Sequence, residues 1–223
     1  MDGRTAVTLL ARIRGRLDRE WARLGWFLTR TIPALRPIYE TRDTQTPITR
    51  QMWFWQKVLG YNRHCYWPVH FTSIVNGSVQ NVYCGIETCP GYSPGCYIQA
   101  IGKIYIGDYT QIAPNVGIIS ANHDLYDNRK HVPSEVRIGA YGWIGMNAMI
   151  LPGVTLGDFT IVGAGATVTK SFEEGYCVLA GNPARVIRRL DPALCVRHRS
   201  AHEYNGYVRH AEFDVFRRRN LAV

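Results

Sequence analysis

From Ile138 to Thr169 the sequence, written in sixes, reads IGAYGW IGMNAM ILPGVT LGDFTI VGAGAT VT. An aliphatic residue opens each six, and the residue four places later is small or β-branched. The same period occurs upstream at Ile106, Ile112 and Ile118, and it extends downstream to Phe172. A period of six fits neither an α-helix nor a single strand, but it is typical of a β-helix repeat. The sequence therefore predicts a β-helix.

Each six-residue unit is expected to form one short strand and one corner, with its aliphatic side chain pointing to the axis. Three units make a coil of about 18 residues, and coils stack about 4.8 Å apart through parallel hydrogen bonds. Because the aliphatic residues fill the core, the functional groups must lie on the outside.

One break in the period is informative. Ile118 and Ile138 are 20 residues apart where six would continue the pattern, so residues 124–137 are expected to form an extruded loop. This loop is polar and charged, and long loops in compact folds are usually functional. His123 ends its six directly before the loop and is expected to be a corner residue that faces outward. The pattern thus places a histidine at the mouth of a projecting loop.

The chain has 223 residues, 46% of them hydrophobic, which suits one domain with an appendage. No apolar run approaches the roughly 18 residues of a membrane-spanning helix. Residues 1–17 contain arginine too early for a secretory signal, so a cytoplasmic location is expected. The net charge of +9 comes from the two ends. Residues 1–36 carry eight arginines and three acids, and residues 185–219 carry nine arginines and four acids.

The six cysteines are Cys65, Cys84, Cys89, Cys96, Cys177 and Cys195. They lack the paired C-x-x-C spacing of zinc modules, and nothing indicates a secretory context. We expect reduced thiols that are mostly buried. A metal bound by Cys84, Cys89 and Cys96 is the weaker alternative, and no metal is predicted.

Composition divides the chain into four parts. These are a basic amphipathic helix and linker in residues 1–50, an aromatic cap in 51–68, the hexapeptide-repeat body in 69–183 and a basic helix or arm in 184–223. The cap is expected to close the open end of the β-helix, since a stack of coils otherwise exposes its terminal ladder and core. Residues 184–190 are expected to begin the C-terminal helix.

Residues 5–30 repeat apolar side chains at every third or fourth position, with arginines between them. Such a helix either packs on the body with a solvated basic side or rests on an anionic membrane surface. The second arrangement would associate the protein with the inner face of the membrane and suits an enzyme that acts on lipid-linked glycans.

Several motifs together resemble the hexapeptide-repeat acetyltransferases over about residues 97–190. The motifs are Ser120-Ala-Asn-His-Asp124, Val136-Arg-Ile-Gly139, Trp143-Ile-Gly-Met-Asn-Ala148, Ile150-Leu-Pro-Gly-Val-Thr-Leu-Gly-Asp158, Val162-Gly-Ala-Gly-Ala-Thr-Val-Thr-Lys170 and Ala180-Gly-Asn-Pro-Ala-Arg-Val-Ile187. The chain looks most like the sugar O-acetyltransferases of the galactoside, maltose and nodulation-factor type and the acyltransferases of capsule and lipopolysaccharide gene clusters.

The resemblance implies a mainly β fold, a left-handed parallel β-helix with an N-terminal helical segment and a C-terminal helix or arm. It also implies a homotrimer that binds acetyl-coenzyme A in grooves between neighbouring subunits. His123 and Trp143 fall on different corners of one prism in the repeat pattern. The Trp143 of one subunit is therefore expected to face the His123 of another.

In the family the histidine that matches His123 is the general base, and no acyl-enzyme forms. A sugar hydroxyl is a poor nucleophile at neutral pH, and an imidazole with a pKa of about 6.5 is suited to take its proton. The reaction also needs a donor for the oxyanion and an acceptor that orients the imidazole. The sequence identifies neither group.

Other site residues follow from the resemblance alone. Positions matching the family's coenzyme A contacts are Trp143, Gly145, Met146, Ala164, Thr169, Lys170, Arg185 and Arg188. Candidate acceptor contacts are Tyr97, Gln99, Asn122, Asp124 and His131. Met146 departs from the small polar residue often found there, and the two arginines also fit a solvated helix face. The N-terminal half departs from the family, so the acceptor stays open.

The sequence is thus predicted to encode an acetyl-coenzyme A-dependent O-acetyltransferase that acts on a sugar or glycan hydroxyl, such as a polysaccharide or lipopolysaccharide precursor. Alternatives within the fold are an N-acetyltransferase of an amino or nucleotide sugar, an antibiotic acetyltransferase and a gamma-class carbonic anhydrase. The last needs outward histidines on neighbouring rungs, and only His131 lies near His123. A non-enzymatic basic scaffold is a further alternative, but no nucleic acid partner is predicted.

Overall fold

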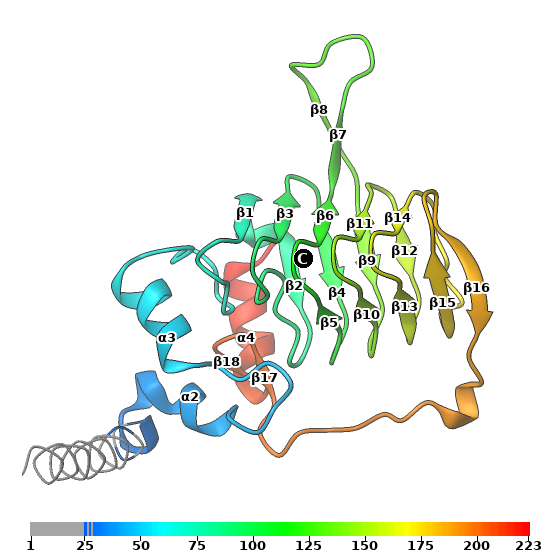
Figure 1. Ribbon diagram of the computed structural model, residues 1–223. Helices are drawn as coiled ribbons and strands as arrows, with labels where there is room; N and C mark the ends of the chain where they lie inside the picture. Colours follow the sequence, from blue (N-terminus) through cyan, green and yellow to red (C-terminus); the bar gives the residue numbers. More distant parts are fainter. Residues whose placement is uncertain (1–24, 26, 28) are drawn as a thin grey trace, which may run out of the picture.

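The computed structural model describes residues 25, 27 and 29–223 (Figure 1). Most of the amphipathic helix expected at residues 5–30 lies outside the described residues, so that expectation stays a prediction. Among the described residues, no helix has both the length and the apolar character that a membrane span requires.

The body is a three-sided prism formed by three sheets, which we call A, B and C (Figure 1). Sheet A runs in the order β1 (Ile74–Gly77), β3 (Tyr97–Ala100), β6 (Gly117–Ile119), β11 (Met149–Ile150) and β14 (Thr167–Val168). Sheet B contains β2 (Val82–Cys84), β4 (Ile104–Ile106), β9 (Val136–Ile138) and β12 (Thr155–Leu156). Sheet C contains β5 (Gln111–Ile112), β10 (Trp143–Ile144), β13 (Thr160–Val162), β15 (Cys177–Ala180) and β16 (Arg185–Arg189).

All strand pairs within these sheets are parallel except β15 with β16. The chain visits sheets B, C and A in turn, which is the path of a parallel β-helix and confirms this part of the predicted fold. The aliphatic position of each six is buried at a relative exposure of 8% or less in Ile106, Ile112, Ile118, Ile138, Ile144, Ile150, Leu156, Val162 and Val168. The six-residue period therefore identifies the positions buried in the core, as predicted.

The predicted limits of the extruded loop, residues 124–137, were wrong. The chain leaves the prism earlier, because β7 (Ala121–His123) pairs antiparallel with β8 (His131–Pro133) as a projecting hairpin (Figure 1). Val136 is fully buried and pairs with Ile104, so β9 already belongs to sheet B. His123 consequently lies on the hairpin and is not a corner residue of the prism.

The helix expected to begin at residues 184–190 is also absent, because this segment forms β16. Strand β16 pairs antiparallel with β15, and Val186 packs against the core. The pairing supplies partners for the last strand of sheet C, which a helix at this place would leave open.

Helical turns and helices lie mainly at the N-terminal end of the prism (Figure 1). They are η1 (Pro33–Leu35), α2 (Arg36–Glu40), α3 (Arg50–Trp53), the π-helical turn η2 (Phe54–Val58), η3 (Val79–Asn81), η4 (Pro192–Leu194) and α4 (His210–Asn220). Only part of the aromatic run at residues 51–68 packs into the core. Trp67 is fully buried, and its indole Nε1 donates to the carbonyl of Pro90 at 2.7 Å. Trp53 and Trp55 are half-buried, and Phe54 is exposed.

The C-terminal segment returns along the prism to this same end (Figure 1). We call residues 190–203 the strap. The strap leads to a small hairpin of β17 (Tyr204–Asn205) and β18 (Val208–Arg209) and then to α4. Phe213 and Phe216 of α4 pack against Tyr66, so α4 and the segment around Tyr66 together close one end of the prism.

The cysteines are free thiols, and all except Cys195 are buried. Burial raises the pKa of the Cys65 and Cys89 thiols to about 12. Buried, protonated thiols of this kind act as small apolar groups rather than nucleophiles.

Candidate active site

The hairpin holds His123 away from the body of the prism. Its two strands place His123 directly opposite His131, and their ring centroids are 4.5 Å apart. At the base, the Ser134 N–H donates to the carbonyl of Ser120 at 2.7 Å, which closes the excursion. A 13-residue projection from 121 to 133 therefore begins and ends at one point of the prism edge.

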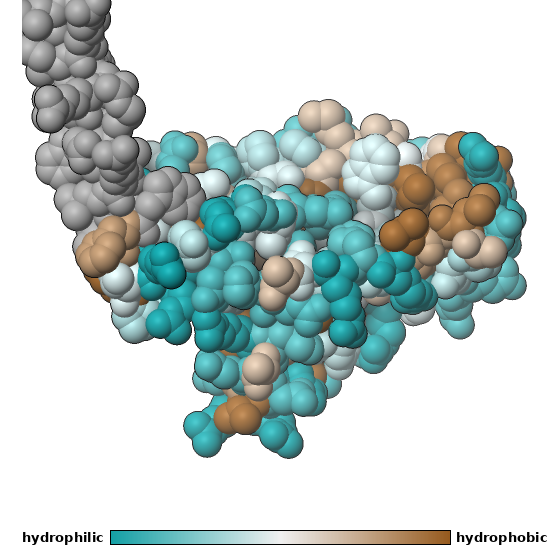
Figure 2. All heavy atoms as spheres, turned by 90° about the horizontal axis from the view of Figure 1, so that it is seen from below, coloured by the Kyte–Doolittle hydropathy of each residue, from teal (hydrophilic) through white to brown (hydrophobic). Residues whose placement is uncertain are grey.

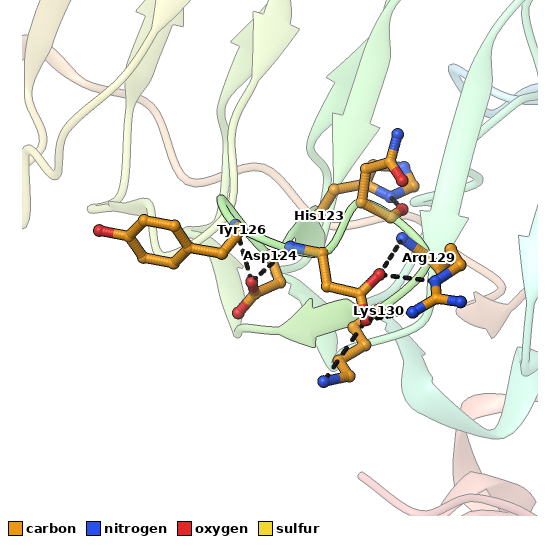
Figure 3. A network of polar contacts seen from close by, with 7 residues as sticks. His123, Asp124, Tyr126, Arg129 and Lys130 are labelled. Atoms are coloured by element: carbon orange, nitrogen blue, oxygen red, sulfur yellow. Dashed lines mark hydrogen bonds and ion pairs between the residues drawn. The ribbon is translucent and has the colours of Figure 1, made fainter.

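Acidic side chains order the turn of the hairpin (Figure 3). Asp124 Oδ1 accepts hydrogen bonds from the N–H groups of Tyr126 and Asp127, both at 2.9 Å. Asp127 in turn binds Arg129 at 2.8 Å and Lys130 at 3.5 Å, and the hydrogen bond from Arg129 lowers the pKa of Asp127. The phenol of Tyr126 points away from this network and is almost fully exposed. The predicted acceptor contact Asp124 thus orders the turn.

The imidazole of His123 has a fixed tautomer. Its Nδ1 lies 2.5 Å from the carbonyl oxygen of Asn128. A carbonyl can only accept, so Nδ1 carries the proton, and Nε2 of the neutral ring keeps a lone pair. Asn128 is the orienting acceptor that the sequence could not identify. Its contribution comes from the backbone, so no side-chain pattern could have marked it.

The two predicted acceptor residues on β3 differ in their surroundings. Tyr97 is exposed on the outer face of sheet A, and its hydroxyl accepts a hydrogen bond from Asn76 at 3.3 Å. Gln99 supports the base of the hairpin, because its Oε1 accepts from the Ala121 N–H at 3.0 Å and its carbonyl from Ser120 Oγ. Asn122 and His131 are exposed on the hairpin beside His123.

The outer face of sheet C carries an ordered row of side chains. Gln111, Trp143, Ile161 and Val178 are register partners in successive strands, and Arg188 pairs with Val178 at the end of the row. Trp143 is 56% exposed. From Trp143 to Arg188 the row spans three rungs, about 14 Å. The face is therefore apolar along its middle and basic at its C-terminal end.

The corner that follows sheet C contains the other predicted contacts. Met146 and Ala164 are exposed there. Gly145 is buried, and a Cβ at this position would lie 2.7 Å from Ala164 N and Val162 O. Gly145 is therefore required by the close approach of two coils. Thr169 and Lys170 are exposed after β14.

The arginines of β16 are not equivalent. Arg189 forms an ion pair with Glu174 at 3.0 Å. Arg185 and Arg188 are exposed and form no ion pair with any residue that the structure describes. They lie on a strand and not on the helix face expected from the sequence, and they are free to meet an anionic ligand.

His123 and Trp143 are not brought together within one chain. The hairpin projects from the prism edge next to sheet A, whereas β10 lies in sheet C on another side (Figure 1). A site that uses both residues therefore needs a second copy of the chain. In the described part of the chain, no three His, Cys, Asp or Glu residues are grouped as metal ligands.

Comparisons with known proteins agree with this architecture. Residues 135–170 match the family model described as bacterial transferase hexapeptide (six repeats). The galactoside O-acetyltransferase of Escherichia coli K12 is 40% identical over 92 residues, which are 40% of this chain and 45% of that protein. The chain spans about half the length of the curated relatives it matches.

Among solved structures, a maltose O-acetyltransferase from Clostridium difficile superposes with a TM-score of 0.51 at 24% identity, covering 73% of this chain and 90% of that one. At this identity the likeness concerns the fold. The hexapeptide model, the E. coli relative and the shared fold confirm the resemblance read from the motifs: this chain is a left-handed β-helix whose residues 135–170 match the bacterial transferase hexapeptide repeats, and it is similar to the sugar O-acetyltransferases.

Proposed function

We propose that this protein transfers an acetyl group from acetyl-coenzyme A to a hydroxyl of a sugar or glycan. The observation that carries the proposal is the His123 imidazole. It is exposed on the hairpin, its Nδ1 proton is held by the Asn128 carbonyl, and its Nε2 can accept a proton. This is the arrangement that general-base catalysis requires.

The chemistry of the chain is proton removal and orientation. His123 Nε2 accepts the proton of the acceptor hydroxyl as the oxygen attacks, and the Asn128 carbonyl stabilises the imidazolium through Nδ1–H. Acetyl-coenzyme A supplies an acetyl group already activated as a thioester, so no acyl-enzyme is needed. As the C–O bond forms and the C–S bond breaks, the His123 imidazolium gives its proton to the departing thiolate, which leaves as the free thiol of coenzyme A. The same base would serve an amine, so the choice between oxygen and nitrogen depends on the acceptor site.

The outer face of sheet C fits acetyl-coenzyme A. Ile161 and Val178 offer apolar contact to a pantetheine arm, and Arg188, which forms no ion pair with a described residue, stands at the end of the row for the nucleotide phosphates. Met146 and Ala164 are exposed at the adjoining corner, with Arg185 on β16. Trp143 then marks the thioester end of the row.

The proposed assembly is a homotrimer. In this arrangement the hairpin of one subunit brings His123 to the Trp143 of the next, because a single chain keeps these residues on different sides. Leu125 and Tyr126 at the hairpin tip are 93% and 98% exposed in the single chain, as expected for side chains that contact a neighbouring subunit in the assembly.

A complementation experiment tests the shared site. The variants His123→Ala and Trp143→Ala should each be nearly inactive, and refolding them together should restore part of the activity through mixed interfaces. Light scattering gives the mass of each assembly. Mixed samples no more active than the separate variants, or a monomeric mass, would exclude a site shared between subunits.

The function itself is tested by thiol release from acetyl-coenzyme A with a panel of sugars, amino sugars, nucleotide sugars and antibiotics. His123→Ala should lower turnover by about 10² to 10⁴, the usual contribution of a general base. The matched control is His64→Ala, which removes an exposed histidine from the cap. If no acceptor stimulates thiol release, or if His123→Ala remains as active as His64→Ala, the proposal fails.

We further propose that the protein works in the cytoplasm at the inner face of a membrane, in polysaccharide biosynthesis. The support is the amphipathic arginine-rich pattern of residues 5–30. Sedimentation with anionic vesicles should fall when these arginines are replaced by glutamine, and vesicles of neutral lipid should bind neither form.

A further inference from the structure

One corner of the prism carries an aromatic residue in each of four successive coils. Tyr109, Tyr141, Phe159 and Tyr176 occupy equivalent positions, each with a positive φ between 46° and 58°. Their rings stack with centroids 5.2, 5.0 and 5.2 Å apart. We call this row the aromatic corner. A positive φ is uncommon outside glycine, so its recurrence shows that the backbone takes the same conformation at this corner in all four coils.

The strap is bound along the aromatic corner. Arg197 donates to Asp158 at 2.9 Å and to the Tyr176 hydroxyl at 3.0 Å, and its guanidinium lies 5.0 Å from the Phe159 ring centre. Tyr141 donates from its hydroxyl to the carbonyl of His198 at 2.9 Å. The His198 ring packs on Tyr109 at 4.7 Å. The strap is therefore positioned by specific contacts.

A groove of about 310 Å³ lies between the strap and sheet C, next to Trp143. We call it the corner groove. Its lining residues are Gln45, Tyr109, Gln111, Tyr141, Gly142, Trp143, Phe159, Val196 and His198. Val196 of the strap is 74% exposed at its rim. Figure 2 views the molecule from below, the side along which the strap runs in Figure 1, and shows apolar side chains gathered at the end of the prism where Figure 1 places β15 and β16.

The lining favours a neutral ligand rich in hydroxyl groups. None of these lining residues is Asp, Glu, Lys or Arg. Arg197 stacks on Phe159 but is already paired with Asp158, so a nucleotide or other phosphate would find no cation among the lining residues. Gln45 Nε2 and His198 Nε2 lie 3.2 Å apart and bond to each other, and Gln111 Nε2 donates to the Glu87 carbonyl. The side-chain oxygens of Gln45 and Gln111 can accept from hydroxyl groups, and the exposed indole of Trp143 offers an apolar face. A small site of this kind, apolar with a few placed polar groups, suits a sugar ring.

A buried acceptor beside the groove has an unsatisfied atom. Glu87 is 3% exposed, and among the described residues its Oε1 has no hydrogen-bond partner. Its Oε2 accepts from the Gln45 N–H at 3.3 Å, and its carbonyl accepts from Gln111 Nε2 at 3.4 Å. Glu87 thus adjoins both groove glutamines, and an unpaired buried oxygen costs stability unless water or a ligand donates to it.

The row on the outer face of sheet C indicates where the groove lies relative to a bound coenzyme A. Arg188 stands at one end of the row, and Gln111 at the other lies in the corner groove beyond Trp143. If coenzyme A extends from Arg188 toward Trp143, its reactive end points at the groove. We propose that the corner groove binds a neutral sugar unit of the acceptor glycan, beside the unit that is acetylated. This inference rests on the proposed acetyl transfer and names the part of the chain that selects the acceptor.

Binding in the groove can be measured without turnover. The probes are maltose, lactose and N,N′-diacetylchitobiose, observed by saturation-transfer NMR on the full-length assembly. At least one should bind. Gln111→Ala should weaken sugar binding by about tenfold or more, the effect of one or two lost hydrogen bonds. Val196→Trp fills the groove from the strap and should also weaken binding by about tenfold or more. Val215→Trp, a matched change at an exposed site on α4, should bind like the wild type.

The outcomes separate the two proposals. With a bound sugar, His123→Ala should keep wild-type binding and lose turnover, and Val196→Trp should raise the acceptor KM without changing the KM for acetyl-coenzyme A. Sugar binding that responds to Val196→Trp in a protein without acetyl transfer would support the groove and reject the proposed function. Absence of binding by all three probes, or wild-type binding by Val196→Trp, would overturn the groove assignment.

Discussion

The prism and the hairpin come from one continuous stretch of chain, yet different interactions hold them. In the prism every six residues repeat one buried aliphatic side chain and one set of parallel backbone bonds. In the hairpin the three residues of β8 are all exposed, and the turn depends on two carboxylates and a carbonyl. The apolar period therefore stabilises the scaffold, whereas polar contacts outside that period position the His123 imidazole.

Excision of the hairpin should give the largest effect and would test this separation directly. Ser120 and Ser134 already share a hydrogen bond of 2.7 Å, so residues 121–133 can be replaced by two glycines with little strain on the prism. Turnover should fall by about 10² to 10⁴, as for loss of the base alone. The thermal unfolding midpoint, measured by circular dichroism, should stay close to that of His123→Ala.

Two results would contradict the distinction between prism and hairpin. A shortened chain that fails to fold would mean that the hairpin contributes to the prism. Activity retained after excision would mean that the base lies elsewhere.

A core substitution should show the opposite pattern. Ile144 is fully buried between Ile112 and Val162 in sheet C, so Ile144→Ala should lower the free energy of unfolding by about 2 to 5 kcal/mol. Turnover per folded molecule should change little at temperatures where the variant is folded. Val132→Ala on the exposed strand β8 is the control and should leave chemical denaturation unchanged. Equal destabilisation by both variants would contradict the distinction between prism and hairpin.

What the sequence could predict follows the same division. The spacing from Ile106 to Val168 identified the buried positions, because one residue type had to recur wherever the core repeats. The loop limits were three residues off at the start. Antiparallel pairing of β7 with β8 leaves no mark in a six-residue period, and Val136 was assigned to the loop although it enters sheet B.

The site was predictable only where side chains carry it. His123 stands out by its place at the break in the period, but the Asn128 carbonyl that orients it has no signature in sequence. The strand at residues 185–189 was predicted as a helix. Its arginines obscure the alternation of inward and outward side chains, which becomes clear only from the pairing with β15. The aromatic corner could have been found, since Tyr109, Tyr141 and Phe159 hold the same position in their sixes.

The smallest effect should come from the end of the prism, where α2 meets the C-terminal return. Glu40 contacts Tyr204 and Arg209. Burial raises the pKa of this carboxyl, but the hydrogen bonds from Tyr204 and Arg209 outweigh it, and the pKa lies below its ordinary value of 4.5. Because the folded pKa is depressed, the stabilisation is complete above pH 4.5 and is lost as the pH falls through the folded pKa.

Glu40→Gln should therefore lower the unfolding midpoint slightly at pH 7, where partly exposed ion pairs contribute little. The difference from the wild type should shrink as the pH falls below 4.5. The matched control is Glu212→Gln, which removes an acid from the first turn of α4. A difference between wild type and Glu40→Gln that is constant from pH 7 to pH 3 would mean that packing, and not charge, joins α2 to the C-terminal return. Packing would then hold the end of the prism, as it holds the core, whereas charged and polar contacts hold the hairpin.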